Sequence, residues 1–212
     1  MLRSFCAVAV LTVILFSSSA YCHEHIMVGV NADGIIGSAD DYQLCIYGVP
    51  SVIEMLPTGE YIGDKQIYVG EMDCWHSGEE SGHRLDYNDE STTPVWLISL
   101  MRISYSDSTN FWMEDEATTL EILTSNGATY AFDAPQWEDE ENWYFHNHTE
   151  FLALADGAGQ TFSATFTVFD TGSTGFTESA QYTLNFITVP EPASIALLGS
   201  AALAIFRAKR KC

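Results

Sequence analysis

The alternation that decides the fold class is clearest in Phe162–Val168, which reads FSATFTV. Every second residue is apolar and the residues between are Ser or Thr, which is the period of a strand with one buried face. The same period recurs in Tyr182–Phe186 and Ile26–Val30, and no sustained helical period lies between Tyr21 and Thr188. The sequence therefore predicts an all-β fold for this part of the chain.

Further short apolar runs are separated by turn residues. Asn126-Gly127 lies between two of these runs and predicts a β-hairpin, whereas the acidic stretches 71–90, 114–116 and 138–141 have the composition of loops. Many short strands at such spacing favour a single β-sandwich of jelly-roll or immunoglobulin-like type. The additional predicted strands are Ile67–Val69, Val95–Ile103, Glu121–Leu123 and Tyr130–Phe132.

Acidic residues dominate the chain between its two ends. The formal net charge is −21, and 28 of the 29 acidic residues lie between Tyr21 and Pro190, with only Lys65, Arg84 and Arg102 as basic residues. Nucleic acids and anionic lipids are bound through Lys and Arg, so such a surface excludes nucleic acid as a partner. It attracts cations, or it serves only to keep the protein soluble.

The N-terminus has the three parts of a secretory signal. Arg3 precedes an apolar run from Cys6 to Phe16, and small residues follow at Ser18 and Ala20. This order predicts cleavage by signal peptidase after Ala20, with cleavage after Cys22 as the alternative.

The C-terminus also has three parts. Val189, Pro190, Glu191 and Pro192 come first, and an uncharged run from Ala193 to Phe206 precedes a final basic cluster. Basic residues stay on the cytoplasmic side of a membrane, so we expect the uncharged run to form a transmembrane helix in the precursor.

This tail resembles the PEP-CTERM sorting signal, which is also labelled an ice-binding protein C-terminal domain. The resemblance implies an exported bacterial protein that an exosortase-type transpeptidase processes at the inner membrane, with release to the outer surface or cell envelope near extracellular polysaccharide. A permanent single-span anchor is the alternative. The chain then divides into a signal peptide (1–20), an ectodomain (21–188) and a sorting signal (189–212).

Two cysteines inside the ectodomain, Cys45 and Cys74, remain when both ends are removed, and Cys22 is a possible third. Because exported proteins fold in an oxidising compartment, we expect these two to form a disulfide. Two free buried thiols are the alternative.

The six histidines form three pairs, and two of these have the pattern His-x-His. Residues i and i+2 of a strand face the same way, so the two rings of such a pair can reach one metal ion. In both patterns the histidines alternate with the apolar positions of their strand. The pairs are His23/His25, His76/His83 and His146/His148.

If the strands of His23/His25 and His146/His148 lie together, four imidazoles converge, with Glu24 and Glu150 near them. Imidazole and carboxylate ligands suit zinc, which we take as the expected cofactor. Chance placement of histidines on polar strand faces is the alternative. His76 and His83 lie in a Gly/Glu-rich stretch that predicts a loop, where a metal role has less support.

A second resemblance concerns the ectodomain. His-x-His close to the mature N-terminus, Gly29-Val30-Asn31-Ala32, the later Phe145-His146-x-His148 and the strand from Gly175 to Phe186 look like a PEP-CTERM family repressed by the zinc-uptake regulator. The resemblance implies zinc binding by His23, His25, His146 and His148, and it carries no catalytic activity.

The common catalytic motifs are absent from the sequence. The sequence has no Gly-x-Ser-x-Gly elbow, no His-Glu-x-x-His helix and no P-loop, so we expect a protein that is not an enzyme. A zinc ion with an open position could still activate water. The alternative to metal binding is a structural or polysaccharide-associated matrix protein, because five tryptophans offer rings for sugar contacts.

Overall fold

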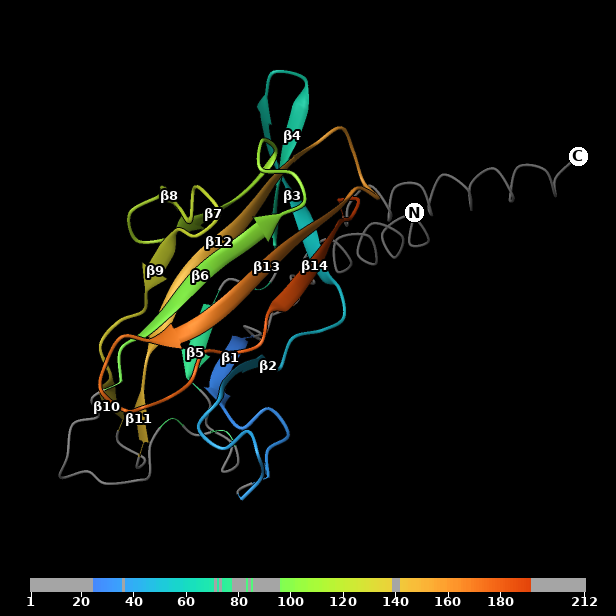
Figure 1. Cartoon of the computed structure of the whole chain (residues 1–212). Helices are drawn as coiled ribbons and strands as arrows, with labels where there is room; N and C mark the ends of the chain where they lie inside the picture. The colour runs from blue at the N-terminus through green and yellow to red at the C-terminus, as the bar shows by residue number, and fades with distance from the viewer. Residues whose placement is uncertain are drawn as a thin grey trace, which may run out of the picture. The chain divides into compact units, whose positions relative to one another are not determined.

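The computed structural model describes residues 25–35, 37–70, 72, 74–77, 83, 85, 96–138 and 142–191, with side chains left undescribed at 137, 138, 142 and 143. Contacts group His23–Val189 as one compact unit, and the described part is built of strands, which confirms the all-β prediction (Figure 1). The strands are β1 (His25–Val30), β2 (Leu44–Tyr47), β3 (Ile53–Ile62), β4 (Lys65–Gly70), β5 (Cys74–Ser77), β6 (Ile98–Tyr105), β7 (Phe111–Asp115), β8 (Leu120–Ile122), β9 (Thr129–Ala131), β10 (Gln136–Glu138), β11 (Asn142–Tyr144), β12 (His146–Ala155), β13 (Thr161–Asp170) and β14 (Tyr182–Thr188).

Twelve of these strands belong to one open sheet with the order β2-β1-β5-β12-β4-β3-β14-β13-β6-β9, while β7 pairs with β12 and β8 with β7. Neighbours are antiparallel except for two parallel pairs, β1 with β5 and β14 with β3. Strands β10 and β11 form a separate two-stranded sheet. The sandwich type, jelly-roll or immunoglobulin-like, stays a prediction.

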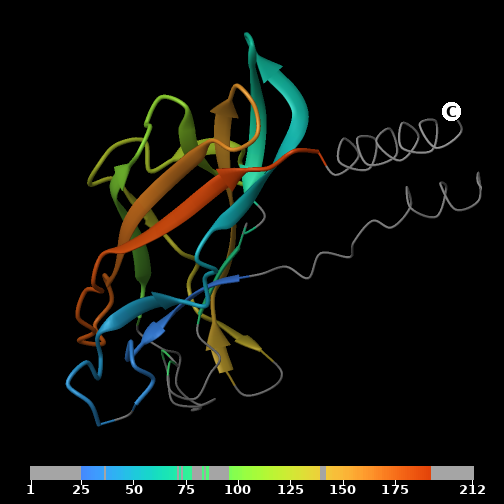
Figure 2. The ribbon, with the colours of Figure 1, turned by 90° about the vertical axis from the view of Figure 1, so that its right-hand side faces the viewer.

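Strand β12 organises the sheet because it is long enough to have different partners along its length. Its first residues pair with β5, and its last residues pair with β4. On its other edge it pairs with β7. The β3–β4 hairpin extends at one end of the unit, and β1 and β2 lie at the other, as Figures 1 and 2 both show.

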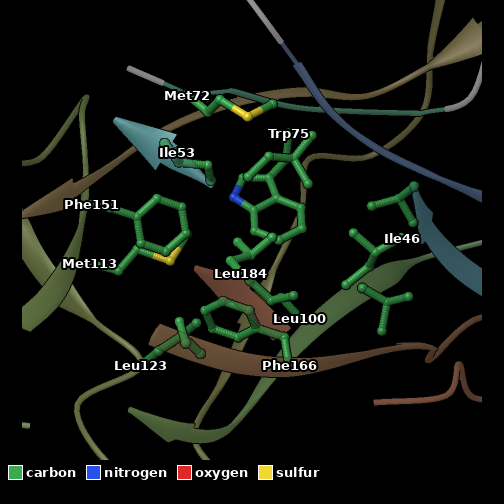
Figure 3. Packing of buried hydrophobic residues seen from close by; sticks show 14 of the residues in the cluster. Ile46, Ile53, Met72, Trp75, Leu100, Met113, Leu123, Phe151, Phe166 and Leu184 are labelled. Carbon is green, nitrogen blue, oxygen red and sulfur yellow. The ribbon is translucent and has the colours of Figure 1, made fainter. Parts of the chain in front are cut away.

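The alternation seen in the sequence produces the core. In β13, Phe162, Ala164, Phe166 and Val168 are buried, and Leu184 and Phe186 of β14 pack with them. Figure 3 shows Phe166, Leu184, Phe151 and Trp75 gathered in one apolar cluster. Burying one such Phe or Leu stabilises the fold by roughly 1.5–3 kcal/mol.

One predicted hairpin is not formed, although the turn is. Gly127 has φ of +82°, as the Asn-Gly signal requires, but β8 pairs with β7 and β9 pairs with β6. The backbone N–H of Gly127 donates to the Arg102 carbonyl of β6 at 2.8 Å. Long-range pairing with β6 therefore replaces the local hairpin.

The loop prediction was also wrong in two places. Glu114 and Asp115 belong to β7, where they pair with β12, and 74–77 forms β5 inside the stretch 71–90. Both strands are short and combine apolar with polar residues, so their pairing with β12 decides their conformation.

The predicted signal peptide and most of the predicted sorting signal lie outside the described residues. Within the described ranges, no helix has the length and apolar character needed to cross a membrane.

Candidate metal centre

Three adjacent strands, β1, β5 and β12, place one row of side chains in the core. Ile26, Trp75 and Asn147 occupy matching register positions, and all three are buried. The indole Nε1 of Trp75 donates to Thr149 Oγ1 at 3.1 Å. These residues fix the phase of each strand, so the residues before and after them point to the opposite face.

That opposite face carries the metal-ligand side chains, and we call it the histidine face. Adjacent register positions across β1, β5 and β12 bring together two rows of three residues. The first row consists of His25, Cys74 and His148. The second row consists of Met27, His76 and His146.

Three of these side chains could hold one metal ion. Donor atoms of His25, Cys74 and His146 all lie within 4.8 Å of one another. Two nitrogens and a sulfur bound to one zinc ion would be about 3.3–3.6 Å apart, given Zn–N and Zn–S bonds of about 2.0–2.1 and 2.3 Å. The donors therefore need to approach by only about 1 Å, a distance that small side-chain rotations cover.

The predicted convergence of β1 and β12 takes an unexpected form. The two strands are not hydrogen-bonded to each other, because β5 lies between them. His25 and His146 still meet, with ring centroids 5.2 Å apart. The predicted residues His23 and Glu24 lie outside the described residues.

His76 lies on the histidine face and not in a loop with His83. It is 4% exposed, and its Nδ1 lies 2.7 Å from the Ser77 carbonyl oxygen. Sequence reasoning missed this position because the Gly/Glu-rich stretch that follows hides the strand. The available signal was Cys74-Trp75-His76 itself, two ligand types flanking a core tryptophan.

His148 shares the histidine face, at the rim. Its Nδ1 is 3.2 Å from Glu116 Oε2, and its ring centroid is 4.7 Å from that of His146. A carboxylate on one imidazole nitrogen orients the ring and leaves the other nitrogen to accept or coordinate. Glu150, predicted as an extra ligand, follows on β12 and pairs in register with Glu114 of β7.

His83 has a structural environment away from the histidine face. Its Nδ1 lies 3.0 Å from the Val30 carbonyl oxygen, and its ring stacks on Tyr47 with centroids 4.3 Å apart. A Cβ at Gly34 would be 3.1 Å from His83 Nε2, so the glycine leaves room for the ring. His76 and His83 thus do not act as a pair.

The predicted disulfide is wrong, because Cys45 and Cys74 are both buried and are not bonded to each other. Cys45 pairs with Gly29, and Cys74 pairs with His25, four residues away along β1. That separation is about 13 Å along the strand, whereas a disulfide needs Cα atoms within about 7 Å. Burial raises the pKa of Cys45 to about 11, so its thiol stays protonated at neutral pH.

The last strand of the sheet, β14, ends at Thr188. The backbone N–H of Val189 donates to the Met55 carbonyl at 3.0 Å, and Pro190 and Glu191 are exposed. Proline has no N–H, so Pro190 cannot continue the sheet. A family model described as the PEP-CTERM protein-sorting motif matches residues 188–211, from the last residue of β14 onward. The chain carries a PEP-CTERM sorting signal.

The PEP-CTERM motif supports an exported, cell-envelope-directed protein that an exosortase processes. None of the curated proteins has a significant similarity to the chain. The resemblance of the ectodomain to a family repressed by the zinc-uptake regulator stays a prediction.

Proposed function

We propose that this PEP-CTERM protein binds a divalent metal ion, zinc first of all, at the cell envelope through the histidine face of its ectodomain. The observation that carries the proposal is the meeting of His25, Cys74 and His146 from three strands, with donor atoms within 4.8 Å. The function is binding of the ion and not catalysis.

The donor types favour zinc over the abundant hard cations. Thiolate and imidazole are ligands for zinc and other late transition metals, while magnesium and calcium prefer oxygen. The net charge of −21 adds a general attraction for cations, although it does not select among them.

The fold supports a site of fixed geometry. Each candidate ligand stands on a strand whose neighbouring side chain is locked in the core: Ile26 beside His25, Trp75 beside Cys74 and Asn147 beside His146. Ligands held by packed strands lose little conformational entropy on binding, which raises affinity.

The test is the metal content and zinc affinity of the exported protein, purified without a polyhistidine tag and titrated against a chelator of known affinity. We expect one zinc ion per chain at the site, and weaker binding in His25→Ala and in His146→Ala. His83→Ala, which removes a histidine outside the histidine face, is the matched control. Zinc binding that is unchanged in both of the first two variants rejects the assignment.

A further inference from the structure

Three imidazole rings on the histidine face form a nearly equilateral triangle. The ring centroids of His25 and His76 are 5.3 Å apart, and each lies 5.2 Å from the centroid of His146. Each strand of the face, β1, β5 and β12, contributes one ring. The triangle therefore depends on the register of all three strands.

The size of the triangle agrees with tetrahedral zinc. A Zn–N bond is about 2.0–2.1 Å, and the centre of an imidazole lies about 1.1 Å beyond its nitrogen, so each ring centre would be about 3.2 Å from the ion. Two such centres at the tetrahedral angle are about 5.2 Å apart. All three separations in the triangle are close to that value. Among the described residues, the donor atoms that lie within 4.8 Å of one another belong to His25, Cys74 and His146. His76 therefore completes the site only when its ring turns its Nε2 atom toward the ion.

His76 has the tautomer that a ligand of this kind needs. A carbonyl oxygen only accepts hydrogen bonds, so the Nδ1 that lies 2.7 Å from the Ser77 oxygen carries the proton. The Nε2 atom is then the ring nitrogen that can coordinate an ion. A backbone carbonyl on the outer nitrogen is a common way of orienting zinc-bound histidine.

Cys74 supplies a fourth donor at the same place. It lies opposite His25 in the β1–β5 register, and its Sγ is within 4.8 Å of donor nitrogens of both His25 and His146. It is fully buried and directly precedes Trp75, whose anchoring in the core fixes its direction.

We propose that His25, Cys74, His76 and His146 form a closed, four-coordinate zinc site with three nitrogens and one sulfur. This inference rests on the proposed function and deepens it. A site with four protein ligands has no position for water, unlike catalytic zinc sites, which keep one open. The protein therefore retains the ion and does not use it to hydrolyse a substrate.

Zinc K-edge X-ray absorption on the zinc-loaded exported protein tests the coordination directly, with no variant needed. The expected first shell is three nitrogens and one sulfur without an oxygen. A shell of two nitrogens, one sulfur and an oxygen from water would overturn the closed site while leaving zinc binding intact. Failure of the protein to bind zinc at all would instead reject the proposed function.

The variant His76→Phe keeps a ring in the buried position but removes the donor nitrogen. We expect it to lower zinc affinity by more than about 100-fold, since even outer partners of zinc ligands contribute 10–100-fold. The shell should then lose one nitrogen, and His83→Phe is the control for exchanging one histidine ring. A His76→Phe protein with the wild-type circular dichroism spectrum and unchanged affinity and first shell would refute the role of His76.

Discussion

His146 of β12 is the register partner of His76 of β5, and the two rings meet nearly at right angles with centroids 5.2 Å apart. His76 is buried, whereas His146 begins its strand beside the exposed rim. The pair therefore joins the interior of the histidine face to its edge.

The two cysteines should differ sharply in their effect on zinc binding. Cys74→Ser replaces a thiolate donor by a poor ligand, so we expect zinc affinity to fall by more than about 100-fold, again taking outer-partner losses as a lower bound. Cys45→Ala is the matched control, because Cys45 lies beside Gly29 and its raised pKa keeps it protonated. Chelator competition measures both, and equal losses in the two variants would contradict the site.

His148 and Glu116, at the rim of the histidine face, should influence zinc binding less than the ligands do. Glu116 Oε2 lies 3.2 Å from Nδ1 of His148, which stands next to His146 but outside the triangle of rings. We expect His148→Ala and Glu116→Gln each to change zinc affinity by less than about 10-fold, the lower end of the effect of outer partners. The measurement is the same competition titration, with His146→Ala as the reference. A loss in His148→Ala as large as that in His146→Ala would make His148 a ligand.

A hydrogen bond near the β7–β8 turn makes part of the stability depend on pH. The Tyr130 hydroxyl donates to Asp115 Oδ2 at 2.7 Å, and this bond, followed by others from Thr118, lowers the pKa of Asp115 against a smaller opposing effect of burial. A lowered folded pKa contributes stability above the unfolded value of about 3.9, and this is lost as the pH falls through the folded pKa.

Tyr130→Phe removes this bond, so we expect it to lower the free energy of unfolding at pH 7 by about 1 kcal/mol. This is less than the roughly 1.5–3 kcal/mol of buried charged hydrogen bonds, because water screens Asp115. The difference from wild type should shrink below about pH 4. Urea unfolding at several pH values measures it, with Tyr61→Phe on the exposed end of the β3–β4 hairpin as control. A difference that stays constant down to pH 2 would show that Asp115 is not involved.

The sorting signal should depend on the exposed residues directly after the sheet. Val189 still hydrogen-bonds to Met55, but Pro190 and Glu191 are exposed and accessible to a processing enzyme. We expect Glu191→Ala to block processing in cells that contain the exosortase, so that the unprocessed form accumulates. Mass spectrometry of the C-terminal peptide distinguishes the processed from the unprocessed protein. The control is Glu178→Ala, in the loop before β14. Normal processing of the Glu191 variant would contradict a role for this residue.

The sequence by itself determined the sorting tail and the strand character of the ectodomain, because both are local patterns. The period of two in Phe162–Val168 depends only on neighbouring residues, and so does the phase that turns His25 and His146 away from the core. The C-terminal motif could be recognised from the composition and the order of its three parts, and the family model matches it at residues 188–211.

Only the tertiary structure decided which strands are neighbours. The insertion of β5 between β1 and β12 brings Cys74 and His76 to the predicted histidines and keeps Cys74 away from Cys45. The tertiary structure also pairs β9 with β6 in place of the expected hairpin. Strand order follows from how all the apolar faces are buried at once, and this is a property of the whole chain that no short stretch of sequence contains.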